Sequence, residues 1–235
     1  MIFENPDSSH SPILVWLRKD LRLRDHPAFE AAILEKRPIL PLYIWDPEEG
    51  GEWSPGAASR WWLHHALLSL AKDIQGLGGT LVVRKGKAAE ILPRIAKEHN
   101  IRKIFYSRAY DPPGITTQEA VEEALDEAGL DTGSFNASLL QEPWETKNGT
   151  GKPFQVFTPY WRKSRQVIYR EPAEYAPAKL SFIKQQEPAS SVDSLDLLPD
   201  HSWHQKLESH WDVSEDAAHQ QLQRTVEEVT RSYAT

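Results

Sequence analysis

The chain has 235 residues, of which 40% are hydrophobic and 26% charged, enough for the core of one domain and an appendage. It contains no cysteine, which excludes disulfides, thiolate metal sites and cysteine nucleophiles. Its 27 basic and 34 acidic residues give a net charge of -7, opposite to the positive field of an autonomous duplex-binding domain. We expect a cytoplasmic protein, because the sequence also lacks a signal-peptide pattern and an apolar run of roughly 20 residues that could span a membrane.

Short apolar runs alternate with helix-like segments from residue 13 to residue 136. The apolar runs predict buried strands at residues 13–17, 39–45, 81–84, 103–107 and 132–136. Apolar spacing, prolines and glycines predict helices at residues 27–34, 55–77, 88–97 and 116–128, the last with Thr116 and Glu119 as a capping box. The alternation predicts an α/β fold: a doubly wound, Rossmann-like, five-stranded parallel sheet with strand order 3-2-1-4-5.

The last part of the chain has a different character. Periodicity disappears between residues 162 and 211, where prolines interrupt a mostly polar stretch, which indicates a long surface connection. Ser214 is then expected to cap a terminal helix with one apolar face, formed by Ala218, Leu222, Val226, Val229 and Tyr233. We therefore divide the chain into a disordered leader (1–12), an α/β domain (13–162) and a connector (163–235) that ends in one amphipathic helix.

Polar residues follow the predicted strands at the edge of the sheet where a ligand is expected. In an open parallel sheet, ligands bind beyond the carboxyl ends of the strands where the strand order reverses, here between the first and fourth strands. The residues at these ends are Arg18, Lys19, Asp20, Arg22, Asp46, Arg108, Tyr110 and Asp111. Guanidinium groups suit a planar, polar or anionic ligand. The same charges could instead pair with one another as a solvated rim, and the residues taken alone favour that interpretation.

Motifs for other chemistry are missing from the sequence. It contains no G-x-G-x-x-G after the first strand, no P-loop, no H-E-x-x-H and no G-x-S-x-G. His64 and His65 are adjacent on a predicted helix and so point in different directions. We therefore expect no metal site and name no catalytic residue.

Several segments resemble a known family in order and spacing. The segment VWLRKDLRLRDHPAF at residues 15–29 resembles the opening signature of the DNA photolyase and cryptochrome family. Later blocks of its α/β domain are similar to YIWDP, SRWWLHHALLSL, RKG and YDP, at residues 43–47, 59–70, 84–86 and 110–112, and to the long segment at residues 134–162. Each block alone is weak, but together they are specific, and they are most similar to a bacterial deoxyribodipyrimidine photolyase.

The resemblance implies that the α/β domain holds an antenna pigment, which is a folate, a deazaflavin or a flavin nucleotide. In the family this pigment passes excitation to a flavin in a following helical domain, and that flavin donates an electron to a pyrimidine dimer in DNA. Asp25 and His26 are expected to position the turn into the first helix. The residues that the resemblance assigns to pigment binding are Lys19, Asp20, Arg22, Ile44, Trp45, Asp46, Arg60, Arg108, Tyr110 and Asp111.

Two departures from the family pattern affect the expected ligand. Thr117 and Gln118 stand where an Arg-Asp pair is usual, and Pro113 and Gly114 stand where folate-type members carry Asn-Glu. These departures favour a deazaflavin or a flavin nucleotide over a folate.

The expected partner is the FAD-binding helical domain, in cis or in trans, because the resemblance places that domain after Tyr233 and the sequence ends at Thr235. FAD and DNA would then bind only through that domain, and the chain alone is expected to be inactive. Two alternatives stay open at this point: a separate pigment-binding or cryptochrome-like blue-light sensing module, and a non-functional remnant.

Overall fold

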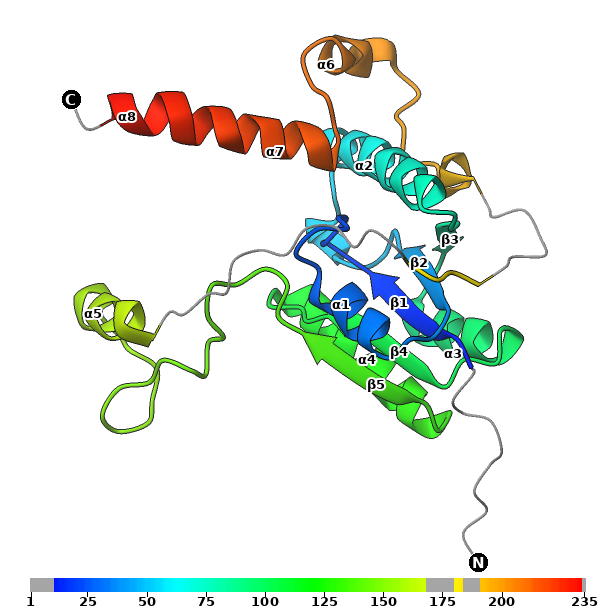
Figure 1. The fold of residues 1–235 in the computed structure, drawn as a ribbon, viewed down its shortest axis with the longest axis horizontal. Coiled ribbons are helices and arrows are strands. Elements are labelled where there is room, and N and C mark those ends of the chain that lie inside the picture. Colours follow the sequence, from blue (N-terminus) through cyan, green and yellow to red (C-terminus); the bar gives the residue numbers. More distant parts are fainter. Residues whose placement is uncertain (1–10, 168–179, 184–190, 234–235) are drawn as a thin grey trace, which may run out of the picture.

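The computed structural model describes residues 11–167, 180–183 and 191–233. Its centre is a five-stranded parallel sheet with the order β3-β2-β1-β4-β5, which confirms the predicted fold and topology (Figure 1). The strands are β1 (Ile13–Leu17), β2 (Ile39–Trp45), β3 (Val82–Lys85), β4 (Lys103–Ser107) and β5 (Asp131–Phe135). The ends of β3 and β5 differ from the prediction by one residue, which is the usual uncertainty of element boundaries.

Helices cover both faces of the sheet. The side chains of Ile13, Val15 and Leu17 pack in one core cluster with α1 (Pro27–Leu34) and α2 (Ala57–Gly76). Leu14 and Trp16 pack in a second cluster with α3 (Ala88–Glu98) and α4 (Pro112–Glu127). Because both faces of β1 are buried, its sequence is continuously apolar and does not alternate with polar residues.

Helix α4 begins earlier than the sequence suggested. The helix starts at Pro112, and the side chain of Asp111 caps it by accepting a hydrogen bond from the Gly114 N–H at 3.3 Å. The predicted start at Thr116, with its capping box, is wrong: the Thr116 hydroxyl lies inside the helix and donates to the Pro112 carbonyl at 3.2 Å. An aspartate at the N-cap followed by proline in the first turn strongly favours the start of a helix. Here it determines the start of α4, and the capping-box spacing of Thr116 and Glu119 does not.

The segments after the sheet extend over and away from it (Figure 1). Helix α5, which the sequence analysis did not predict, projects from the body and runs across the expected boundary at residue 162. Ser214 caps the terminal helix as predicted, because its hydroxyl accepts from the Ala217 N–H. The bounds of these elements are η1 (Gly51–Trp53), α5 (Phe157–Val167), η2 (Val192–Leu195), η3 (Ser202–His204), α6 (Gln205–Glu208), α7 (Glu215–Arg224), the π-helical turn η4 (Thr225–Val229) and α8 (Thr230–Ser232). Most of the expected leader lies outside the described residues.

Part of the connector belongs to the core. Strand β3 is shorter than β2, and Phe182 forms a parallel bridge with Ile39 at the edge of β2 that β3 leaves uncovered. The Phe182 ring lies against Gly79, where an added Cβ would sit 2.5 Å from it. Leu180, Val192, Leu195 and Leu197 are buried in the same cluster as α1 and α2. The expected surface connection is therefore wrong for these residues.

We predict that Leu67→Ala lowers the free energy of unfolding by about 2 to 5 kcal/mol, because Leu67 is fully buried between α2 and the sheet and its removal leaves a cavity. Urea denaturation followed by circular dichroism measures this loss. The matched control is Leu68→Ala on the same helix, where the side chain is 42% exposed and the expected cost is about 0.5 kcal/mol or less. Equal losses in the two variants would contradict this description of the core.

Candidate functional site

A large cavity lies at the carboxyl ends of β1, β2 and β4. Its volume is about 1250 Å³. This is above the range of about 300 to 1,000 Å³ that is usual for small-molecule sites. The loops after these strands form one wall, α2 forms a second, and the start of α7 forms a third. The position agrees with the rule that ligands of doubly wound sheets bind where the strand order reverses.

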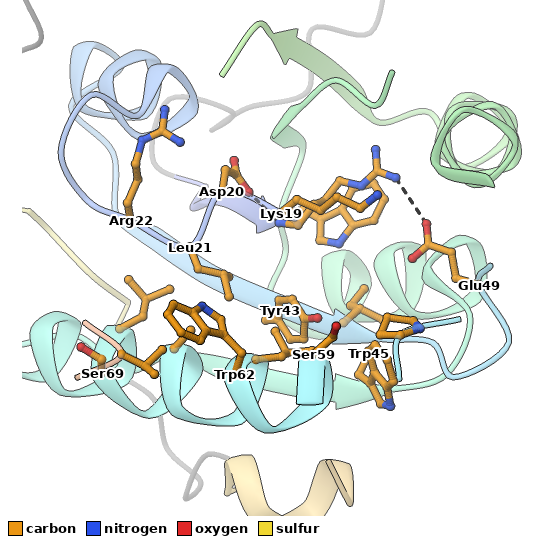
Figure 2. A pocket seen from close by; sticks show the side chains of 18 of the residues that line it. Lys19, Asp20, Leu21, Arg22, Tyr43, Trp45, Glu49, Ser59, Trp62 and Ser69 are labelled. Atoms are coloured by element: carbon orange, nitrogen blue, oxygen red, sulfur yellow. Dashed lines mark hydrogen bonds and ion pairs between the residues drawn. The ribbon is translucent and has the colours of Figure 1, made fainter. Parts of the chain in front are cut away.

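Aromatic and aliphatic side chains line the side of the cavity that α2 borders. Figure 2 shows Leu21, Tyr43, Trp45 and Trp62 along this side, with Ser59 and Ser69 from the same helix. Burial raises the pKa of the Tyr43 phenol well above its ordinary value, and so does the nearby Glu49 carboxylate, so the phenol stays neutral. Flat apolar walls of this kind favour a planar ligand.

Asp20 is a buried residue in the wall of the cavity, and its carboxylate connects several segments of the chain. Its carboxylate accepts hydrogen bonds from the Arg18 N–H at 2.8 Å and from the Ser107 hydroxyl at the end of β4. The His26 Nδ1 atom accepts from the Phe29 N–H at the start of α1, and the Nε2 atom of the same ring lies 2.9 Å from the Asp20 carboxylate. Burial acts to raise the pKa of Asp20, but the hydrogen bonds from His26 and Ser107 lower it to about 2.

The two loops that the topology predicted to form the crevice do meet. The Lys19 ammonium lies 2.8 Å from the Asp111 carboxylate, which joins the loop after β1 to the loop after β4. Arg18 is almost buried, stacks 4.6 Å above the Trp16 ring and donates to the Gly114 carbonyl at 3.1 Å. Its guanidinium also contacts the Glu49 carboxylate at 3.5 Å. Figure 2 shows Glu49 on the opposite side of the cavity from Arg22.

Arg22 holds the chain that leads into α1. Its guanidinium donates to the carbonyl oxygens of Arg24, Asp25 and Ala137, at distances of 2.7 to 3.1 Å. These bonds connect the loop after β1 to the segment after β5. Arg22 therefore lines the cavity and also holds the loops around it in place.

The structure separates the ten predicted site residues into two groups. Seven of them line the cavity, namely Lys19, Asp20, Arg22, Ile44, Trp45, Asp46 and Asp111. Arg60 is not among the lining residues, although its helix forms a wall. Arg108 and Tyr110 lie in a separate polar cluster, where both contact the Glu142 carboxylate. Burial and the hydrogen bond to Glu142 raise the pKa of Tyr110 to about 12.

Helix α7 provides a wall of the cavity that was not predicted from the sequence. Val213, Ser214, Glu215, Ala218, His219 and Leu222 all line the cavity. Both Glu215 carboxylate oxygens accept backbone N–H groups of the loop after β1, from Leu23 at 2.8 Å and from Arg24 at 3.0 Å. Asp216 adds a 2.6 Å ion pair with Arg24. The acidic first turn after Ser214 was visible in the sequence, but nothing there indicated its partner more than 190 residues away.

Two negative findings concern only the part of the chain that the structure describes. Within residues 11–167, 180–183 and 191–233, no group of three or more His, Cys, Asp or Glu side chains is placed to hold a metal ion. Over the same residues, no helix is both long enough and apolar enough to cross a membrane.

The doubly wound sheet, with an aromatic-walled cavity at its switch point, places the domain in the Rossmann-like α/β class. The chain belongs to the DNA photolyase family, whose model matches residues 13–178. This finding confirms the resemblance seen in the sequence motifs.

Curated relatives include both branches of the family. The chain is 32% identical over 224 residues to a deoxyribodipyrimidine photo-lyase of Agrobacterium fabrum, covering 95% of this chain and 46% of the relative. It is 34% identical over 168 residues to cryptochrome-1 of Arabidopsis thaliana, covering 71% of this chain and 24% of the relative. The chain thus spans less than half the length of these relatives.

Solved structures agree with the fold. A bacterial class III photolyase from Agrobacterium tumefaciens matches with a TM-score of 0.83 and 31% identity, over 96% of this chain and 46% of that chain. An archaeal photolyase from Sulfolobus tokodaii, solved with two FAD molecules, matches with a TM-score of 0.65 and 20% identity, over 82% of this chain and 42% of that chain. At 20% identity the second likeness concerns the fold alone.

We predict that Asp20→Asn lowers the free energy of unfolding by roughly 2 kcal/mol at pH 7, because the pKa of Asp20 is about 2 in the folded protein, against an ordinary value of 3.8. The stabilisation is complete above pH 4 and is lost as the pH falls toward 2. The difference between wild type and variant should therefore shrink over that window in urea denaturation. A difference that stays constant from pH 6 to pH 2 would contradict the assignment.

We also predict that Glu215→Gln loosens α7. The charged carboxylate accepts two backbone N–H groups, and hydrogen bonds to charged groups contribute about 1.5 to 3 kcal/mol. Hydrogen exchange at the Leu23 and Arg24 amides should become at least about tenfold faster. The control is Glu227→Gln, an exposed position in η4, which follows α7 directly; among the side-chain hydrogen bonds described, Glu227 contacts only Gln223. Unchanged exchange in Glu215→Gln would show that this contact does not hold the helix.

Proposed function

We propose that this chain is the N-terminal light-harvesting module of a deoxyribodipyrimidine photolyase and that the cavity between the sheet, α2 and α7 holds the antenna pigment. The observation that carries the proposal is the cavity itself, with a volume of about 1250 Å³ and the rings of Tyr43, Trp45, Trp53 and Trp62 in its walls. Such a site suits a flat chromophore better than a small polar substrate.

The architecture supports an energy-transfer role. Transfer of excitation requires a pigment at a fixed distance and orientation, and a site built on sheet and helix residues provides both. Asp20, the pair of Lys19 with Asp111, and Arg22 hold the loops in place through contacts made within the protein. When bound, the pigment would supply light absorption, and the residues around it would orient its ring and exclude water.

A deazaflavin or a flavin nucleotide is the pigment class that we favour over a folate. The Asn-Glu pair of folate-type members is replaced by Pro113 and Gly114, and Pro113 lines the cavity. Gln118, at the second unusual position, accepts a hydrogen bond from the Ala109 N–H at 2.9 Å and so stabilises the loop after β4.

Repair by the whole enzyme belongs to the same proposal. It requires a helical flavin-binding domain, in cis or in trans, and contact with DNA through that domain. In its support, the rod formed by α7, η4 and α8 exposes apolar side chains, with Leu222 58%, Val226 57% and Tyr233 90% exposed. These residues could pack against such a domain. The net charge of -7 is also consistent with a DNA-binding surface outside this chain.

We predict that the purified protein retains a near-UV or blue-absorbing pigment, or binds one when titrated with riboflavin, FMN, FAD or a folate. An absorbance spectrum and mass spectrometry of the released compound identify it. Trp62→Ala should weaken binding by about tenfold or more, because it removes a cavity-wall ring.

The control is Trp203→Ala, since Trp203 is 40% exposed and does not line the cavity. Circular dichroism verifies that both variants are folded. A folded, colourless wild-type protein that binds none of these compounds would overturn the proposal.

A further inference from the structure

We infer that the cavity accepts an uncharged planar ring system and rejects phosphate and carboxylate groups, so that any anionic part of the pigment lies outside the walls described above. The inference rests on the proposed function and deepens it by naming the chemical class that the cavity selects. Four features of the cavity wall carry it.

The first feature is the N-terminus of α4. Helix N-termini at the switch point are the usual phosphate sites of doubly wound folds, because their free N–H groups point at the ligand. In this protein the first two residues of α4 are Pro112 and Pro113, which have no N–H to offer. The next N–H, of Gly114, is directed to the Asp111 carboxylate at 3.3 Å. The helix end that would bind a phosphate is therefore already occupied by an internal anion.

The second feature is the pair of loops after β1 and β2. A phosphate cradle needs backbone N–H groups that converge on the ligand. The Arg18 N–H is directed instead to the Asp20 carboxylate at 2.8 Å. In the same way, the Glu48 N–H is directed to the Asp46 carboxylate at 2.9 Å. Internal carboxylates thus take donors that a phosphate would require.

The third feature is that the cations of the cavity wall already have partners. Lys19 is paired with Asp111 at 2.8 Å. Arg18 contacts the Gly114 carbonyl and the Glu49 carboxylate, and Arg22 donates to three backbone carbonyls. A bound phosphate would have to displace these contacts, which hold the loops together.

The fourth feature is the excess of acidic groups. Six acidic residues and three Lys or Arg residues line the cavity, and the acidic ones are Asp20, Asp46, Glu49, Asp73, Asp111 and Glu215. Burial raises the pKa of Asp73, and so do the nearby carboxylates of Asp216 and Glu215. This end of the cavity already disfavours negative charge, so a further anion would be repelled.

Matched ligand pairs test the inference. Riboflavin and FMN share one ring system and differ by a phosphate. Biopterin and folic acid share a pterin ring, to which biopterin adds an uncharged dihydroxypropyl group and folic acid a p-aminobenzoyl-glutamate tail with two carboxylates. Equilibrium dialysis against the purified chain at low salt measures the affinity for each compound. In whichever pair binds, the uncharged compound should bind at least about tenfold more tightly than the anionic one. The ratio should shrink as the salt concentration is raised from about 0.02 to 0.5 M, because salt screens the repulsion.

The variant Asp111→Asn tests whether the carboxylate at the N-terminus of α4 causes the preference for uncharged ligands. Asparagine caps a helix as well as aspartate does, so α4 keeps its start. The substitution removes one negative charge and releases Lys19 from its ion pair. The preference for riboflavin over FMN should fall by about threefold or more. Asp126→Asn is the matched control, because it makes the same charge change at an exposed position near the other end of α4, about 22 Å along the helix.

Each outcome decides between the two proposals. Tighter binding of FMN or folic acid than of its uncharged counterpart would overturn the inference and leave the pigment site intact. A preference that responds equally to Asp111→Asn and Asp126→Asn would overturn the assignment to the α4 N-terminus. Absence of binding for all four compounds and for FAD, in a folded protein that retains no pigment, would overturn the proposed function, and the inference with it.

Discussion

The buried carboxylate of Asp20 is the contact on which the geometry of the cavity depends. It joins the loop after β1, the end of β4 and, through His26, the start of α1. A buried carboxylate stays charged only when enough donors compensate for its lost hydration. The Arg18 N–H, the Ser107 hydroxyl and His26 surround Asp20 in this way, and the hydrogen bonds lower its pKa. Because strands one and four diverge into different loops at this point, the contact holds the opening between them at a defined width.

The cavity combines an apolar interior with a charged frame. Trp45 and Trp62 belong to its walls, whereas the pairs of Lys19 with Asp111 and Arg18 with Glu49 lie at its polar edge. The interpretation of these charges as a rim of ion pairs therefore describes their contacts correctly. It does not compete with a ligand site, because the pairs position the loops that surround the apolar space.

The C-terminal segment completes the domain that precedes it. Phe182 covers the exposed edge of β2, and Leu195 joins the core beneath α2. Glu215 then fastens α7 to the loop after β1, so that the helix forms a wall of the cavity. Division of the chain into an α/β domain and a separate connector misses this contribution, since sequence periodicity records elements and does not record which elements touch.

Local patterns in the sequence were sufficient for the sheet and, with the order 3-2-1-4-5 adopted for it, for the edge at which the cavity lies. Continuous apolar runs such as residues 13–17 identify strands buried on both faces, and right-handed crossovers restrict their order. They also identified six residues that line the cavity, because side chains at the carboxyl ends of parallel strands converge: Arg18, Lys19, Asp20, Arg22, Asp46 and Asp111. Ile44 and Trp45 came from the family resemblance. Only the tertiary structure decided that Arg108 turns to Glu142, that Arg60 lies off the cavity and that Glu215 closes its third wall. The physical reason is that these outcomes depend on long-range hydrogen bonds and packing, whose partners are far apart in the chain and leave no periodic signal in it.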